Sequence, residues 1–149
     1  MTEEVIIAGA YRTAIGRLSG TLAGMSGVEM GSALIRQSLA RLDLAPDAVD
    51  SVILGQVLTA GAGQNPARQS TIRAGLAQSV PAVTVNQVCG SGLAAIMMAA
   101  REVARGESRA AVVPMGTGHA GAALKGAARR KWQAACASLA SAAAAPSPA

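Results

Sequence analysis

The chain has few aromatic residues and few cysteines. Its 149 residues contain no phenylalanine, one tryptophan, one tyrosine and two cysteines. Two cysteines in different sequence contexts do not form a disulfide framework, so the sequence favours a reducing, cytoplasmic location. A core without aromatic rings has to be built from Ala, Val, Leu, Ile and Met. Such a core suits closely packed helices and parallel strands, and the chain is long enough to fold around one.

Signals for secretion and for membrane insertion are also missing. The first four residues, Met1-Thr2-Glu3-Glu4, are acidic, whereas a secretory signal begins with basic residues. The uncharged stretch 74–100 is long enough to span a membrane. However, Pro81, Asn86 and Gln87 interrupt it, and its first half has a strand pattern while its second half has a helix pattern. We interpret the stretch as buried protein interior and expect no membrane contact.

Lysine is absent from the patterned part of the chain. Up to Arg109, nine arginines nearly balance eight acidic residues. The remaining positive charge belongs to four residues of the tail: Lys125, Arg129, Arg130 and Lys131. A nucleic-acid interface needs a basic face with aromatic stacking partners, and only Trp132 stands near these charges. We expect no nucleic-acid partner, and no residues have the spacing of metal ligands.

Apolar strands alternate with helices over the first 113 residues. The pattern predicts strands over 4–9, 51–55, 83–88 and 109–113. Such alternation indicates an α/β fold with a mostly parallel sheet and helices on both of its faces.

Start and stop signals define the three predicted helices. A capping box at Ser26–Glu29 opens the first, which extends to about Leu42, before a short turn from Pro46 to Asp50. Asn65 and Pro66 open the second, which ends before Gly75. The third follows Cys89, extends to about Arg105 and has Gly106 as a left-handed cap.

The third helix is apolar nearly all round up to Arg101. A helix of this kind belongs between two layers of a protein. A domain this short cannot easily cover it, which indicates a missing second half or a partner subunit.

The character of the sequence changes after Val113. We divide the chain into an incomplete domain, 1–113, and an Ala-rich basic tail, 114–149, with no returning strand pattern. The low complexity of the tail predicts disorder, although alanine also favours a weak helix over 122–145.

Cys89 lies where the third predicted strand turns into the third helix, in the run Asn86-Gln87-Val88-Cys89-Gly90-Ser91-Gly92. A helix start carries unpaired N–H groups and partial positive charge, which favour the nucleophilic thiolate. Gly90 and Gly92 leave room for a substrate to approach the sulfur. From the pattern alone, two interpretations fit: a catalytic nucleophile, or a small buried hydrophobic residue.

Four stretches together resemble the N-terminal part of a thiolase, close to the bacterial acetyl-CoA acetyltransferases. Their order and spacing fit along about the first 113 residues. They are Ala10–Gly16, Val52–Leu58, Gly63–Gln69 and Asn86–Gly92.

The resemblance implies a five-layered fold in which the nucleophile helix is buried centrally. It implies that Cys89 takes an acyl group from an acyl-CoA as a thioester, and that a second acetyl-CoA, deprotonated at carbon, attacks it. Coenzyme A thioesters would be substrates, with no further cofactor. Segment Gln64–Gln69 resembles one that lies near the family's dimer interface and braces the active site, so a homo-oligomer is expected. A plain helix cap is an equally good interpretation of its side chains.

The resemblance also shows what does not match. The family's second half supplies a histidine that activates the nucleophile, a second cysteine and an Asn-His-Glu-Ala-Phe motif. Here His119 and Cys136 do not stand in the matching contexts, so we assign neither a catalytic role. The abrupt change near Pro114 predicts a truncated or frame-shifted thiolase that is inactive alone.

Two alternative functions stay open. The chain could be a non-catalytic partner of a full-length thiolase, or another enzyme of the same fold, such as a ketoacyl synthase. The Cys-Gly-Ser-Gly run and segment Gln64–Gln69 favour thiolase over the latter.

Overall fold

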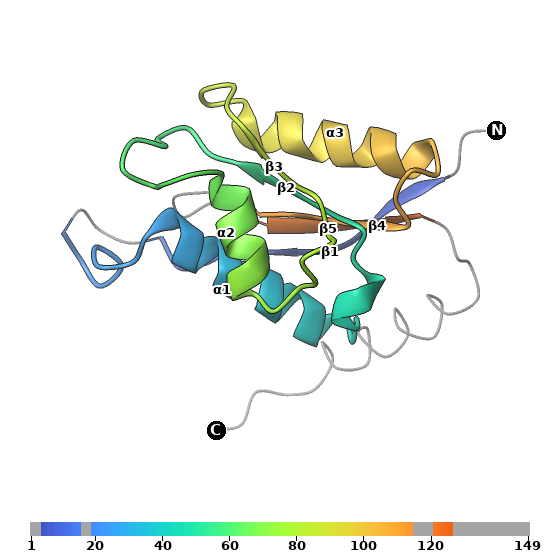
Figure 1. The fold of residues 1–149 in the computed structure, drawn as a ribbon, viewed down its shortest axis with the longest axis horizontal. Coiled ribbons are helices and arrows are strands. Elements are labelled where there is room, and N and C mark those ends of the chain that lie inside the picture. The colour runs from blue at the N-terminus through green and yellow to red at the C-terminus, as the bar shows by residue number, and fades with distance from the viewer. Residues whose placement is uncertain (1–3, 16–18, 115–120, 127–149) are drawn as a thin grey trace.

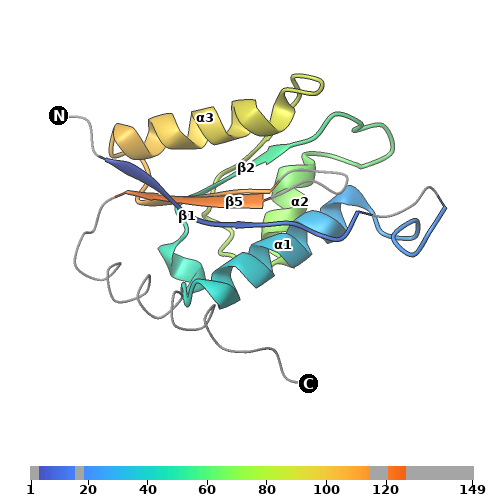
Figure 2. The same cartoon turned by 180° about the vertical axis from the view of Figure 1, so that it is seen from behind.

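A five-stranded sheet lies between two layers of helices. The computed structural model describes residues 4–15, 19–114 and 121–126. Helix α3 covers one face of the sheet, and α1 and α2 cover the other (Figure 1), as the view from behind also shows (Figure 2). In chain order the elements are β1 (Val5–Tyr11), α1 (Gly27–Arg41), the 3₁₀ helix η1 (Pro46–Ala48), β2 (Ser51–Gly55), α2 (Pro66–Arg73), β3 (Ala82–Val85), α3 (Ser91–Ala104), β4 (Ala110–Val113) and β5 (Gly121–Gly126).

Local signals in the sequence place the helix ends correctly. The Ser26 hydroxyl accepts a hydrogen bond from the Glu29 N–H at 3.2 Å, and the Glu29 carboxylate accepts one from the Ser26 N–H at 2.7 Å. The bond from the Ser26 N–H is the main reason that the pKa of Glu29 is lowered. At α2, Asn65 caps the N–H of Arg68 ahead of Pro66. Gly106, just past α3, has the expected left-handed φ of 73°.

The strand order of the sheet is β1-β5-β4-β2-β3. Strand β2 pairs in parallel with both β3 and β4, whereas β5 pairs antiparallel with both β1 and β4. Strands β1 and β4 therefore run in the same direction, and β5 alone opposes the other strands. The predicted α/β class with a mostly parallel sheet is confirmed.

Two expectations about strands are wrong. The first is that no strand follows Val113: β5 occupies residues 121–126, in the predicted tail. The segment has little strand propensity of its own, so its backbone pairing with two neighbours is what makes it a strand. The second is the length of β3, which ends at Val85 because the next residues form a turn. The predicted disorder of the tail, and the alternative of a weak helix over 122–145, are also wrong for residues 121–126, which form β5. Residues 115–120 and 127–149 of the tail lie outside the described residues.

Each face of the sheet has its own core. Beneath α1 and α2, one cluster of buried residues comprises Ile35, Leu39, Val49, Val52, Leu76, Val80 and Val112. Beneath α3, a second cluster comprises Ile53, Ala95, Ala99, Val103, Ala111 and Val113. The alanines let α3 approach the sheet closely. Within the described residues, no helix is long and apolar enough to cross a membrane.

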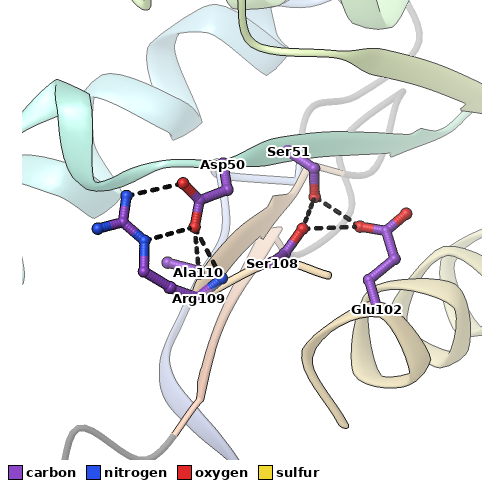
Figure 3. A network of polar contacts seen from close by, with 6 residues as sticks. All are labelled: Asp50, Ser51, Glu102, Ser108, Arg109 and Ala110. Carbon is purple, nitrogen blue, oxygen red and sulfur yellow. Dashed lines mark hydrogen bonds and ion pairs between the residues drawn. The ribbon is translucent and has the colours of Figure 1, made fainter. Parts of the chain in front are cut away.

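A polar network fastens the starts of β2 and β4 to the last turns of α3 (Figure 3). The Asp50 carboxylate accepts bonds from the Arg109 side chain, at 2.8 and 3.1 Å, and from the N–H groups of Arg109 and Ala110. These bonds, the guanidinium ones first, lower the pKa of Asp50. Beside it, Glu102 of α3 accepts from the hydroxyls of Ser51, at 2.7 Å, and Ser108, at 3.3 Å.

Candidate active site

Cys89 lies on a short turn that joins the end of β3 to the start of α3. Its side chain is a free thiol and is exposed. The interpretation of Cys89 as a small buried hydrophobic residue is therefore wrong for this chain. Exposure leaves the sulfur open to a substrate in solution.

Hydrogen bonds within the turn hold its shape. The Ser91 hydroxyl accepts from the Gln87 N–H at 2.9 Å and donates to the Val88 carbonyl at 2.6 Å. The N–H of Gly90 donates to the Gln87 carbonyl at 2.9 Å. Between them, Val88 has a φ of +48°, a conformation that a β-branched residue rarely adopts. The chain thus reverses sharply just before Cys89.

The start of α3 leaves hydrogen-bond donors beside the turn. The N–H of Ser91 donates to the Val88 carbonyl, and that of Ala94 to the Gly90 carbonyl. The intervening N–H groups of Gly92 and Leu93 have no acceptor among the described residues. Free N–H groups at a helix start favour negative charge, such as that of a thiolate or an oxyanion.

The end of β2 packs directly against this helix start. A Cβ atom added at Gly55 would lie 2.8 Å from the carbonyl carbon and oxygen of Ser91, and 2.9 Å from the N atom of Gly92. Such distances exclude any side chain at Gly55 unless the backbone moves. Strand β2 therefore fixes the position of α3, and with it the position of the Cys89 turn.

Asn86 is a site residue to which sequence reasoning gave no role. Its side-chain Nδ2 donates to the Val57 carbonyl at 3.0 Å, and its Oδ1 accepts from the Val88 N–H at 3.1 Å. One residue earlier, the Val85 carbonyl accepts from the Gln56 N–H at 3.0 Å. The turn is thus fastened to the segment after β2. Val57 is 29 residues from Asn86 in the chain, so the sequence contains no signal for this bond. The bond to Val88 had one signal, because an asparagine often accepts a hydrogen bond from the N–H two residues later.

The predicted bracing segment, Gln64–Gln69, lies beside β3. Asn65 donates through Nδ2 to the Ala82 carbonyl at 2.9 Å, and its Oδ1 accepts from the Thr84 hydroxyl at 2.8 Å. Gln69 donates to the carbonyls of Ala62 and Gln64 and so holds the preceding loop. An open cavity of about 610 Å³ lies here, and Asn86 is among the residues that line it. The segment therefore supports the strand that leads to Cys89.

Apolar side chains of the Cys89 turn and of α3 are exposed. Val88 is 66% exposed, Leu93 64% and Met97 45%. The opposite side of the helix is buried on the sheet through Ala95 and Ala99. The outward side of this apolar helix is thus bare, as expected of so short a domain.

Two other chemically interesting residues cannot be placed against the site. His119 and Cys136 lie outside the described residues. Within the part of the chain that the structure describes, no three His, Cys, Asp or Glu side chains are grouped so that they could hold a metal ion. The candidate site as described is the Cys89 thiol, the helix start and the turn that carries them.

Comparison with known proteins assigns this arrangement to a family. Residues 5–138 match the family model described as "Thiolase, N-terminal domain". The chain belongs to the thiolase family. The match extends beyond Val113, the boundary expected from the sequence, whereas the division into domain and tail stays a prediction.

Individual thiolase relatives match a similar part of the chain. It is 55% identical over 108 residues to an acetyl-CoA acetyltransferase of Allochromatium vinosum, which covers 72% of the chain and 27% of that relative. It is 50% identical over 109 residues to the acetyl-CoA acetyltransferase of Cupriavidus necator, with 73% and 28% covered. The crystal structure of the Acat5 thiolase from Ascaris suum, in complex with coenzyme A, superposes with a TM-score of 0.72 at 37% identity, covering 74% of the chain and 29% of Acat5. The chain thus spans little more than a quarter of the length of these relatives.

Proposed function

We propose that Cys89 is the nucleophile of an acyl-CoA acyltransferase of the thiolase type. Its thiolate attacks the carbonyl of acetyl-CoA, forms a thioester and releases coenzyme A. A second acetyl-CoA, deprotonated at its methyl carbon, attacks that thioester, which gives acetoacetyl-CoA and frees the thiolate. The observation that carries the proposal is an exposed cysteine held at a helix start with free N–H groups.

The physical chemistry of the turn fits the first of these steps. A covalent intermediate divides one difficult condensation into two easier steps. Negative charge that develops on the carbonyl oxygen is stabilised by oriented N–H donors, which the start of α3 presents. The names of the relatives, and the coenzyme A bound to the Ascaris suum thiolase, support a coenzyme A thioester as the substrate. No further cofactor is required by this chemistry.

We expect the 149-residue polypeptide alone to show no measurable acetoacetyl-CoA thiolysis. The family resemblance assigns the activating histidine and the second cysteine to the other half of the fold. The chain has one histidine, His119, and its sequence context does not match. A positioned acid or base contributes roughly 100- to 10,000-fold to such reactions.

Acetylation of Cys89 tests the proposal without requiring full turnover. A Cys136→Ser chain, in which Cys89 is the only thiol, would be incubated with acetyl-CoA at neutral pH and examined by intact mass and peptide mapping. We expect one acetyl group on Cys89, faster in the folded chain than in urea, and none in a matched Cys89→Ser chain. A folded chain that gains no acetyl group on Cys89 would contradict the nucleophile. Thiolysis turnover that depends on Cys89 would contradict the expected inactivity.

A second candidate is a non-catalytic partner of a full-length thiolase. The bare apolar side of α3, with Leu93 and Met97 exposed, favours it because such a side gains free energy when it is covered. Co-purification with a tagged full-length thiolase, lost in a Leu93→Gln chain, would support this function. An unchanged monomer in the presence of that thiolase would contradict it.

A further inference from the structure

We propose that Asn86 is a positioning residue that holds the Cys89 turn in its reactive shape. The inference rests on the proposed function for its purpose, because a positioned sulfur matters only if Cys89 reacts. The positioning role does not involve coenzyme A. It rests on two hydrogen bonds of the Asn86 side chain and on the conformation of Val88.

The first bond stabilises an unfavourable backbone conformation. Val88 has a φ of +48°, and left-handed conformations are costly for β-branched residues. The Asn86 Oδ1 accepts from the Val88 N–H at 3.1 Å and so offsets part of that cost. Val88 is 66% exposed, so packing of its side chain does little to hold it there.

The second bond fastens the turn to the sheet. The Asn86 Nδ2 donates to the carbonyl of Val57, in the segment that follows β2. Strand β2 also fixes the start of α3, because Gly55 packs against the backbone of Ser91. The turn is thus held at two points. Asn86 bonds to Val57, just after β2, and Gly55, the last residue of β2, packs against the start of α3. Cys89 lies between these two points in the chain, just before the start of α3.

Without Asn86, the left-handed residue loses its partner and the turn loses its link to Val57. Val88 then relaxes toward a negative φ, and Cys89 moves away from the helix start. Replacement of Val88 by glycine removes the conformational cost itself, because glycine adopts positive φ freely. The structure thus makes a specific prediction. Removal of Asn86 has a large effect with valine at position 88 and a smaller one with glycine, where the bond to Val57 is still lost but the left-handed conformation costs little.

The experiment measures alkylation of Cys89 by iodoacetamide at neutral pH, in the full Cys136→Ser chain. We expect Asn86→Ala to slow alkylation by about threefold to tenfold, since an interaction with a helix terminus is of that size. The double variant Asn86→Ala/Val88→Gly should return to within about twofold of the Val88→Gly chain. Ser26→Ala, which removes a side-chain cap at a different helix, is the matched control and should leave the rate unchanged.

Two results would overturn the inference: an unchanged rate in folded Asn86→Ala, as judged by circular dichroism, or no recovery in the double variant. If Asn86→Ala does not fold, hydrogen exchange of the parent chain decides the matter. We expect the Val88 amide to be protected from exchange by its hydrogen bond to Asn86. Exchange at the rate of an unstructured peptide would show that this bond is not formed. Because neither measurement uses acetyl-CoA, the positioning role and the acyltransferase function fail or succeed separately.

Discussion

The helices on the two faces of the sheet differ in the side chains that they expose to solvent. Helix α1 buries Ile35 and Leu39 on the sheet and exposes polar residues such as Arg36 and Gln37. Helix α3 buries small residues on the sheet and exposes Leu93 and Met97. The face beneath α1 and α2 thus has a core under a largely polar exterior, on which Ile72 of α2 is 41% exposed. The outer side of α3 has the composition of a protein interior, which indicates a surface that is suited to being covered. Cys89 lies just before this helix in the chain.

The sharpest test of this difference compares one large side chain from each face. Ile35→Ala should lower the free energy of unfolding by about 2–5 kcal/mol, because Ile35 is fully buried and leaves a cavity. Leu93→Ala, the matched control on α3, should change it by less than about 0.5 kcal/mol. Urea denaturation measures both. Equal losses would show that the outer side of α3 is covered in solution and would remove the contrast.

A second test acts on the contact between β2 and α3. Gly55→Ala should cost about 1–3 kcal/mol, because the new methyl group would overlap the backbone of Ser91 and Gly92. The same change should slow acetylation of Cys89, since the start of α3 has to move. Gly24→Ala is the control, because a Cβ atom at Gly24 has no neighbour within 4 Å. Thermal unfolding of the two variants provides the comparison, and equal midpoints would contradict the close contact.

The smallest effect is expected at the other end of α3, in the network around Asp50. Its lowered pKa means that Asp50 stabilises the fold fully above the ordinary value of an aspartate, about 4, and that this contribution is lost as the pH falls through the lowered value. Asp50→Asn should cost about 1 kcal/mol near pH 7, since the pair with Arg109 is partly screened by solvent. Denaturation between pH 3 and 7 should give a flatter pH dependence for the variant. If the free energy of unfolding depends on pH equally in the two proteins, the pKa of Asp50 does not change on unfolding and the prediction is wrong.

The sequence was sufficient wherever a signal lies close to the structure that it specifies. Ser26 and Glu29 cap α1 within one turn, and Gly106 ends α3 through its own backbone freedom. The Cys89 turn was placed correctly between strand and helix for the same reason.

Features that depend on distant partners could not be predicted. The bond from Asn86 to Val57, and the pair of Asp50 with Arg109, join residues that are far apart in the chain and have no shared motif. Strand β5 is the clearest case, because its residues do not favour a strand and only the two open edges beside it make one. The sequence also predicts that β3 extends to residue 88, because nothing in the apolar Val88 indicates its left-handed conformation.

The position of β5 between β1 and β4 determines when β1 can pair during synthesis of the chain. Val5 pairs with Gly126, and β5 separates β1 from β4, so within the described sheet β1 has no partner until β5 has been synthesised. At ordinary translation rates, that delay is roughly ten seconds. During it, the nascent chain carries β1 without its partner strand, which makes β1 a natural target for a chaperone.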